Sequence, residues 1–284
     1  MRVILRWTCS QARSGSDVRL ARFILVLRAA QRTYWYQPLL EAAGLATPEA
    51  LAAVTSVEHT LVRLPAVDLN KFRSSPAAFE SPGRRHATSQ PFRSPLEHLP
   101  RTAILMQGFE QSSGVRVIAR NWSNGLKHFA ATALAGPVAA LREIATAIES
   151  GLAEAPPLKH FVVPFTLAPE GALSAHDRDR FWRVFRVPVF EQRLGFDGQV
   201  IAYECEAHDG LHILPERAAF EETLNSEFLL TSLTDLRYPT LRVGTQVAGA
   251  IQRDCCDCGH ATARLMSAKP LPAPGPLAAM AAAC

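Results

Sequence analysis

The residues best suited to chemistry in this 284-residue chain gather in two short stretches of its last third. Residues 204–212 read ECEAHDGLH, and residues 255–260 read CCDCGH. Thiolates and imidazoles are ligands that zinc prefers in proteins. The two other cysteines, Cys9 and Cys284, lie near the ends of the chain. A disulfide-stabilised secreted fold would spread its cysteines more evenly, so the local cluster favours metal binding.

The spacing of these residues indicates which side chains can meet. If Asp209-Gly210 forms a two-residue hairpin turn, the flanking strands pair directly. Side chains alternate between the two faces of a strand, so Cys205 and His212 share one face. Cys256 and Cys258 also point the same way on an extended segment. A closed tetrahedral set of three thiolates and one imidazole would be a structural zinc site, with the ligands Cys205, His212, Cys256 and Cys258.

Three further residues in the two stretches are spare ligand candidates: His208, Cys255 and His260. The competing interpretation is that these residues are unrelated, with Cys205 as a small buried hydrophobe and the histidines at the surface. A lone cysteine or histidine would favour that interpretation. A Cys-x-Cys-Gly pair combined with a Cys and a His on one hairpin face favours zinc, judged by the number of ligands such sites need.

Other catalytic signatures are absent from the sequence. It contains neither a G-x-S-x-G elbow nor an H-E-x-x-H motif, and it has no G-x-x-x-x-G-K-[ST] or G-x-G-x-x-G phosphate loop. The polar stretches at 112–114 and 121–125 are typical of turns, and the charged run at 176–180 is typical of a solvated helix start. The sequence therefore assigns no catalytic or cofactor-binding residue.

The composition indicates an ordinary globular protein and argues against several classes. The chain is 48% hydrophobic and 20% charged, and 30 Lys+Arg against 26 Asp+Glu leave a formal charge of +4. The basic residues are scattered, which argues against a nucleic-acid partner. The early apolar run at 23–27 is too short to span a bilayer, and the first residues lack a secretory apolar stretch. We therefore expect a cytoplasmic protein with reduced thiols and no membrane partner.

The elements that must position the cluster follow from periodicity and turn signals. Residues 1–100 predict an N-terminal helical segment followed by an irregular loop, with helices at 20–32, at 34–45 and from Thr47, and the loop at 73–100. Residues 101–199 predict an α/β core with a parallel sheet, built from strands at 160–165 and 187–190 and helices at 137–150 and 175–186. Leu141, Ile144, Ala145 and Ile148 share one face of the first helix, and residues 174–177 predict a capping box at the start of the second.

After residue 199 the pattern becomes all-β. Residues 200–268 predict a β-rich subdomain pinned by zinc, with strands at 200–205, 211–214, 228–233 and 241–251. Residues 269–284 predict a disordered tail of low complexity. The expected fold class is α/β, a mixed sheet with flanking helices joined to this β subdomain.

Several segments carry a family resemblance. They are FRVPVFEQ at 185–192, ECEAHDGLH at 204–212, LTSLT at 230–234, PTLR at 239–242 and CDCG at 256–259 followed by Arg264. With these segments, the stretch from Arg142 to Leu265 resembles the phenylacetate–CoA ligase branch of the adenylate-forming (AMP-forming) enzymes. YQPLLEAAGL at 36–45 is similar to the first helices of that family, and the matches cover a little under half of the chain. The resemblance implies a partial adenylate-forming core and a structural zinc.

Other motifs of that family are altered or missing. Its Ser/Thr/Gly-rich phosphate loop is not found, and its Y-G-x-T-E motif falls on residues 194–198, where only Gly195 matches. Its R-Y-x-T-G-D motif falls on residues 242–247, where Arg242 and Thr245 remain but the acidic residue is gone. Its C-terminal domain with the catalytic Lys has no counterpart after Arg264. Adenylation needs neutralised phosphates and an aligned carboxylate, so these changes predict impaired or absent activation.

Two functions therefore stay open. One is an AMP-forming aryl- or acyl-CoA ligase relative that uses ATP and CoA, with the missing parts supplied by a partner chain. The other is a non-catalytic, zinc-stabilised module that binds a small-molecule carboxylate or a partner protein. Pyrophosphate release would separate the two.

Overall fold

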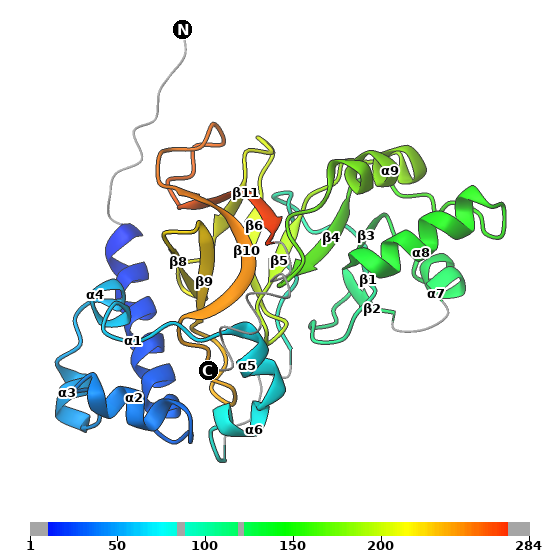
Figure 1. Cartoon of the computed structure of the whole chain (residues 1–284). Helices are drawn as coiled ribbons and strands as arrows, with labels where there is room; N and C mark the ends of the chain where they lie inside the picture. The colour runs from blue at the N-terminus through cyan, green and yellow to red at the C-terminus, as the bar shows by residue number, and fades with distance from the viewer. Residues whose placement is uncertain (1–10, 84–88, 119–121, 272–284) are drawn as a thin grey trace, which may run out of the picture.

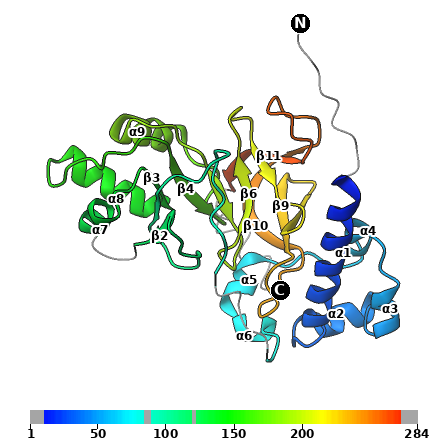
Figure 2. The same cartoon turned by 180° about the vertical axis from the view of Figure 1, so that it is seen from behind.

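The computed structural model describes residues 11–83, 89–118 and 122–271 of the chain. Within these ranges, one mixed sheet of eleven strands runs through the molecule in the order β2-β1-β3-β4-β5-β6-β7-β11-β10-β9-β8. Figures 1 and 2 show helices α7, α8 and α9 at one end of this sheet and the N-terminal helices at the other. The fold is α/β with a mixed sheet and flanking helices, as the sequence predicts.

The bounds of the elements are as follows. The helices are α1 (Gln11–Ala30), α2 (Tyr36–Ala42), α3 (Pro48–Ala52), α4 (Val57–Leu61), α5 (Leu69–Ser74), α6 (Pro76–Phe79), α7 (Trp122–Phe129), α8 (Val138–Glu149) and α9 (Ala175–Phe185). The strands are β1 (Thr102–Ile104), β2 (Val115–Val117), β3 (Ala133–Pro137), β4 (Val162–Leu167), β5 (Gln192–Leu194), β6 (Val200–Glu204), β7 (Leu211–Ile213), β8 (Ala218–Glu222), β9 (Glu227–Ser232), β10 (Val243–Gln252) and β11 (Arg264–Pro270).

Strands β1 to β5 form the parallel half of the sheet. Helices α7, α8 and α9 cover one of its faces, because the apolar stripe of α8 that periodicity predicts (Leu141, Ile144, Ala145) packs with α9 and the strands. At the start of α9, Ser174 accepts a hydrogen bond from the backbone N–H of Asp177, the predicted cap. Each of these helices thus buries one apolar stripe against the same face of the sheet.

The opposite face of the parallel half is covered by the irregular segment around residues 89–110. Phe92 of this segment lies 6.3 Å from Phe161 between ring centroids, and Phe109 stacks on Phe165 at 5.2 Å. The segment therefore contributes to the core although it has little regular structure. Part of the loop predicted at 73–100 is helical, since α5 and α6 occupy residues 69–79.

Strands β5 to β11 form the antiparallel half. The last described strand, β11, lies in the interior of the sheet, where it pairs with β7 on one side and with β10 on the other. Figure 1 shows β10 curving beneath β9 towards the N-terminal helices. The boundary predicted at residue 199 falls between β5 and β6, which pair as antiparallel neighbours in the same sheet.

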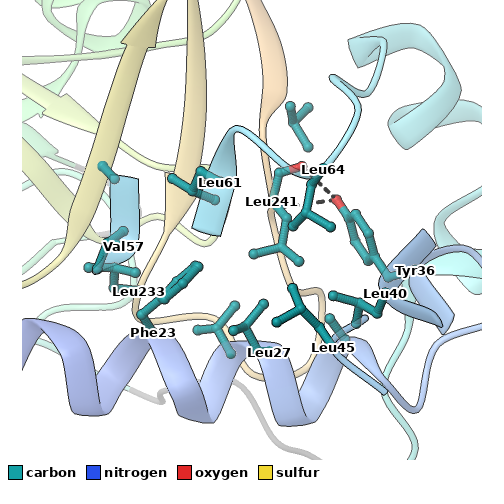
Figure 3. Packing of buried hydrophobic residues seen from close by; sticks show 14 of the residues in the cluster. Phe23, Leu27, Tyr36, Leu40, Leu45, Val57, Leu61, Leu64, Leu233 and Leu241 are labelled. Atoms are coloured by element: carbon teal, nitrogen blue, oxygen red, sulfur yellow. Dashed lines mark hydrogen bonds between the residues drawn. The ribbon is translucent and has the colours of Figure 1, made fainter. Parts of the chain in front are cut away.

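The N-terminal helices pack on the end of the antiparallel half. Phe23 and Leu27 of α1 contact the same apolar cluster as Leu233 and Leu241 (Figure 3). Within this cluster, the buried hydroxyl of Tyr36 donates a hydrogen bond to the Leu241 carbonyl at 3.2 Å and accepts one from the Leu241 N–H at 3.1 Å. Burial raises the pKa of Tyr36 well above its usual range, so the hydroxyl stays protonated as a donor.

Four sequence expectations need correction; one is that residues 122–125, expected as part of a turn, begin helix α7. Residues 187–190 do not form a strand; Val189 makes one isolated bridge to Val162, and the strand begins at Gln192. A proline at 188 lacks the N–H that a continuous ladder requires. Residues 269 and 270, predicted as the start of a disordered tail, belong instead to β11, and residues 272–284 of that prediction lie outside the described residues. Six strands, β1, β2, β3, β5, β8 and β11, were not predicted.

In the portion of the chain that the structure covers, no helix has both the length and the apolar character to cross a membrane.

Replacing Tyr36 by Phe is expected to destabilise the fold by about 1–3 kcal/mol, because both backbone groups of Leu241 then lose their buried partner. Tyr34→Phe is the matched control, since Tyr34 is 84% exposed and its change should stay within about 0.5 kcal/mol. Urea unfolding measures both values. Equal effects of the two substitutions would show that the Tyr36 hydroxyl does not tie the helices to the sheet.

Candidate metal centre

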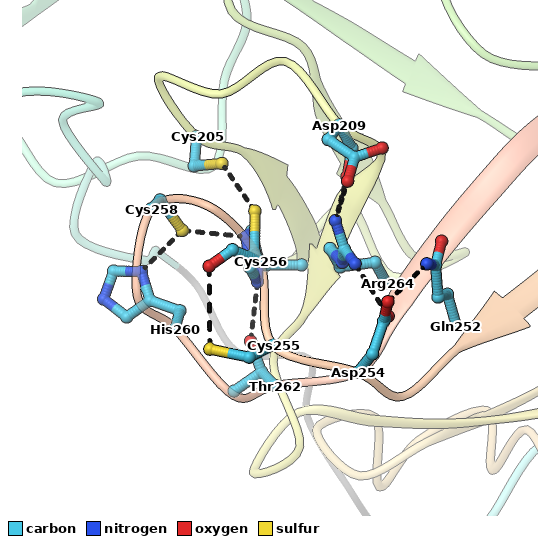
Figure 4. Close-up of polar contacts among 11 residues, drawn as sticks. Cys205, Asp209, Gln252, Asp254, Cys255, Cys256, Cys258, His260, Thr262 and Arg264 are labelled. Atoms are coloured by element: carbon cyan, nitrogen blue, oxygen red, sulfur yellow. Dashed lines mark hydrogen bonds and ion pairs between the residues drawn. The ribbon is translucent and has the colours of Figure 1, made fainter.

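The structure brings the four predicted residues Cys205, His212, Cys256 and Cys258 together at one side of the antiparallel half (Figure 4). Their ligand atoms all lie within 4.8 Å of one another. His212 is fully buried, Cys205 and Cys256 are buried, and Cys258 is partly buried. The group therefore combines one imidazole and three thiols in a site largely closed to solvent.

The distances fit a tetrahedral ion. The sulfurs of Cys205 and Cys256 are 3.7 Å apart, and the Cys258 sulfur lies 3.4 Å from His212 Nε2. Zn–S bonds of about 2.3 Å at a tetrahedral angle place two sulfurs about 3.8 Å apart, and a shorter Zn–N bond brings sulfur and nitrogen slightly closer. This donor set can bind a metal such as zinc, and four protein ligands leave no position for a substrate.

The protonation states of these residues are set by burial and by their neighbours. Burial, together with the thiols of Cys258 and Cys256, raises the pKa of Cys205 to about 12. The pKa of Cys256 is lowered in spite of its burial, because hydrogen bonds from Cys258 and the charge of Arg264 favour the thiolate. Burial lowers the pKa of His212 and keeps the imidazole neutral. A bound divalent cation would replace the protons that the thiols hold, so binding would release protons.

The orientation of His212 is fixed by a residue that the sequence does not single out. Its Nδ1 lies 2.8 Å from the hydroxyl of Thr262, which leaves Nε2 facing the thiols. A hydrogen bond at one ring nitrogen that frees the other is the usual support of a metal-binding histidine. Thr262 was missed because its partner is fifty residues away in the chain, and only the pairing of β7 with β11 brings them together.

The hairpin that carries Cys205 and His212 differs from the one predicted. Tyr203 pairs with His212 and Glu204 with Leu211, so the connection is a six-residue loop and not a two-residue turn at Asp209-Gly210. The loop is four residues longer than predicted. Because four is an even number, each side chain stays on the predicted face of the sheet. Cys205 and His212 therefore still lie on the same side of the sheet.

A tight turn presents the other two thiols. The N–H of Gly259 donates to the Cys256 carbonyl at 2.8 Å, and the N–H of Cys256 donates to the His260 carbonyl at 3.2 Å. Gly259 has a φ of +84°, a conformation that side-chain-bearing residues rarely adopt. The Cys-x-Cys-Gly pattern thus has a local structural reason beyond its thiols.

Arg264 joins the two stretches beside the ligands. Its guanidinium binds the Asp209 carboxylate of the hairpin loop and the Asp254 carboxylate, the latter at 2.8 Å, next to the cysteine turn. The side chain is 1% exposed, and its two carboxylate partners raise the pKa of Arg264 although burial acts in the opposite sense. Figure 4 shows this clamp next to the thiols.

The three spare candidates lie outside the group of four. His260 Nδ1 is 3.4 Å from the Cys258 sulfur, where it can donate to a thiolate. Cys255 is exposed and its thiol contacts the Cys256 carbonyl at 3.6 Å. His208 contacts the Glu204 carboxylate at 2.9 Å and stacks on Phe190 at 5.1 Å. Cys9 and Cys284 lie outside the described residues.

Glu204 anchors the end of β6 immediately before Cys205. Its carboxylate accepts from the Glu191 N–H at 2.7 Å and from the guanidinium of Arg178 on α9 at 3.0 Å. The buried carboxylate therefore connects the helical face of the parallel half to the start of the loop that carries Cys205.

A separate cavity of about 360 Å³ lies beyond the carboxyl ends of β4 and β5. Leu167, the last residue of β4, and Phe196 line it, together with Phe72, Arg73 and Tyr238 among others. Arg73 donates to the Ala168 carbonyl at 2.7 Å. Carboxyl ends of parallel strands are where open α/β sheets bind small molecules.

Comparisons with solved structures identify CoA ligases with the same fold. An open conformation of 2-hydroxyisobutyryl-CoA ligase, in complex with 2-HIB-AMP and CoA, aligns with a TM-score of 0.64 at 15% identity, over 87% of this chain and 72% of that one. The same ligase in its postadenylation state, in complex with R3-HIB-AMP, aligns with a TM-score of 0.64 at 16% identity, over 91% of this chain and 68% of that one. No family model and no curated protein matches the sequence. The chain thus has the α/β fold of acyl-CoA ligases.

Gly210→Ala is expected to destabilise the hairpin loop more than an ordinary glycine replacement. Gly210 has a φ of +78°, and a Cβ there would lie 2.5 Å from Met266 Sδ and 2.8 Å from the Leu265 carbonyl oxygen. Backbone strain and overpacking together should cost about 2–4 kcal/mol.

Gly151→Ala is the matched control, because its φ is +72° but nothing lies within 4 Å of the added Cβ. Guanidinium unfolding should show a clearly smaller loss of about 1–2 kcal/mol for this variant. Similar losses for both would mean that the close approach of β11 to the hairpin loop does not constrain Gly210.

Proposed function

We propose that this chain is a phenylacetate–CoA ligase-like protein in which ATP-dependent activation of a carboxylate is impaired or absent. Its fold then serves as a zinc-stabilised module that binds a small-molecule carboxylate. The shared fold with an acyl-CoA ligase and the segments that resemble the phenylacetate–CoA ligase branch support the relationship. In this proposal, ATP and CoA are cofactors only of the ligase activity, which is weakened or lost.

The observation that carries this proposal is that the side chains of the motif at residues 242–247 are bound to other parts of the fold. Arg242 binds the Glu221 carboxylate at 2.9 Å and the Leu64 carbonyl. Thr245 donates to the Phe228 carbonyl at 2.8 Å. Val247, at the position of the family's acidic residue, is fully buried in the apolar core of the antiparallel half. All three side chains are engaged in the fold, and an apolar group stands where the family holds the ribose hydroxyls.

The turn at residues 194–198 supports the same conclusion. Asp197 accepts from the Thr234 hydroxyl at 2.5 Å and from the Gln199 N–H at 3.2 Å, so its carboxylate is occupied by the protein. Gly198 takes the place of the glutamate of the family motif. Without that glutamate, the only acidic side chain in this turn is Asp197, and both of its oxygens already accept hydrogen bonds from the protein. Adenylation requires the phosphate charge to be neutralised, and this turn is poorly suited to that role.

The role proposed for Cys205, His212, Cys256 and Cys258 is to bind one structural zinc ion. The tetrahedral spacing of the four ligand atoms and the neutral, oriented imidazole support it. Such an ion would link the loop after β6, strand β7 and the turn before β11. Its binding free energy would contribute directly to the folding of this region.

The purified protein is expected to contain one zinc per chain by elemental analysis. Cys256→Ser and Cys258→Ser should lose most of this metal and lower the Tm by roughly 5 °C or more, because a closed four-ligand site contributes several kcal/mol to folding. Cys255→Ser is the matched control in the same turn, and it should retain both metal and Tm. Wild-type protein without zinc after growth in zinc-supplemented medium, or equal metal content in all three variants, would contradict the proposed ligands.

Pyrophosphate release tests the loss of activation. With ATP, magnesium, CoA and a panel of aromatic and fatty acids, the chain should release no more pyrophosphate than the reaction without protein, since the motif residues are engaged in the fold. Turnover by the chain alone would overturn the proposal and establish an active ligase. Turnover only after addition of a partner chain would favour the enzyme hypothesis in which that partner supplies the missing parts.

A further inference from the structure

A second cavity, of about 290 Å³, lies between α1 and the loops that precede β6 and β8. Arg22 and Leu25 of α1 line it from one side, and Gln199, Arg217, Leu233, Thr234 and Leu236 line it from the sheet. These residues come from four separate segments of the chain, so the cavity is a product of the tertiary fold. It is distinct from the metal centre and from the cavity at the ends of β4 and β5.

We infer that this cavity binds a small organic carboxylate that carries an apolar group, with the carboxylate between Arg22 and Arg217. The inference deepens the proposed function, because it rests on the proposal that the chain binds a carboxylate without activating it. The ligand class follows from three features of the cavity: its charge, an amide on its lining that makes no hydrogen bond to a described residue, and its apolar wall.

The charge of the cavity lining is positive. Arg22 donates from Nη1 to the Glu216 carbonyl at 2.7 Å, and Arg217 donates from Nη1 to Gln90 Oε1 at 2.9 Å. Each guanidinium keeps further N–H groups that no described residue accepts, and the lining contains no acidic side chain. Burial lowers the pKa of Arg217, and Arg22 and Arg93 add to this effect, while Glu216 and Asp197 oppose it. An anion between the two guanidiniums would offset their repulsion and accept their free N–H groups.

Gln199 supplies the second feature. The residue is only 8% exposed, and its backbone is bonded to Gly195 and Asp197. Its side-chain amide makes no hydrogen bond to any described residue, and it lines the cavity. Because the amide lines the cavity and makes no hydrogen bond to a described residue, its N–H groups are available to a ligand there. The amide N–H₂ group can donate to a carboxylate oxygen that the two arginines leave free.

The apolar wall decides between classes of anion. Leu25, Leu233 and Leu236 face the same space as the guanidiniums. Inorganic phosphate would leave this wall uncovered, whereas an aliphatic or aromatic tail would bury it. The volume is near the lower limit of small-molecule pockets, which restricts the ligand to a short-chain or single-ring acid.

The binding of hexanoate and of phenylacetate, measured by isothermal titration calorimetry in the absence of ATP, tests this inference. Both acids should bind the full chain with a Kd of about 1 mM or below, and neither 1-hexanol nor inorganic phosphate should bind comparably. Arg22→Met and Gln199→Leu should each weaken hexanoate binding by about tenfold or more, as expected for lost hydrogen bonds to a charged group. Gln199→Leu should retain the Tm, since the amide has no partner to lose.

Two matched variants locate the ligand. Arg28→Met changes an exposed arginine on the same helix, and it should leave the affinity unchanged. Arg73→Met alters the cavity at the ends of β4 and β5, and it should also leave the affinity unchanged. Binding that is lost with Arg73→Met but kept with Arg22→Met and Gln199→Leu would overturn the inference. So would phosphate binding without carboxylate binding, or no binding of either acid.

The outcome is independent of the ligase assay. Carboxylate binding that depends on Arg22 together with pyrophosphate release would refute the loss of activation and retain this site. Absence of both binding and release would refute this site and retain the loss of activation.

Discussion

The pairing of β11 with both β7 and β10 is the constraint on which the rest of the structure depends. Arg264 lies opposite His212 in β7 and opposite Gln252 in β10, so one residue belongs to both ladders. β7 and β10 are not neighbours, and without β11 the strands β8 to β10 would lose their hydrogen bonds to the rest of the sheet. β11 comes last among the described strands, and its partner β7 lies far earlier in the chain. The antiparallel half is therefore complete only when this contact of high sequence separation forms.

The metal centre lies at the point where this late strand joins the sheet. Two of the candidate ligands, Cys205 and His212, belong to the hairpin with which β11 pairs. The other two, Cys256 and Cys258, belong to the turn that leads into β11. The Arg264 clamp makes the same connection with charge, through Asp209 on one side and Asp254 on the other. A metal ion held by these four residues would oppose the same separation as the clamp, that of β11 from β7. Without them, the pairing depends on the few backbone hydrogen bonds of a three-residue strand.

The sequence predicts much of this arrangement, and its failures have physical causes. Face parity places Cys205 and His212 together even though the turn is four residues longer than predicted, because parity depends only on whether the difference is even. The long helix α8 and the cap at Ser174 are predicted because their signals are local. Strands β1 and β2 have three residues each, and β3 contains Ala, Gly and Pro, which are poor in strand propensity. Thr262 and the two cavities depend on tertiary contacts that no spacing shows.

The residues that resemble a ligase motif also show why the likeness of fold and the likeness of activity can separate. Arg242 and Thr245 match the family pattern, yet their contacts are to Glu221 in β8, the Leu64 carbonyl of the N-terminal region and Phe228 in β9, so both side chains hold the start of β10 in the fold. A residue in this position can thus be required by the sheet as well as by the chemistry. Val247 and Gly198 meet the structural requirement alone. Val247 fills the core, and Gly198 adopts a φ of +76° in a turn. Two motif positions that differ from the family pattern, Gly198 and Val247, are therefore positions where the present side chain suits the local fold.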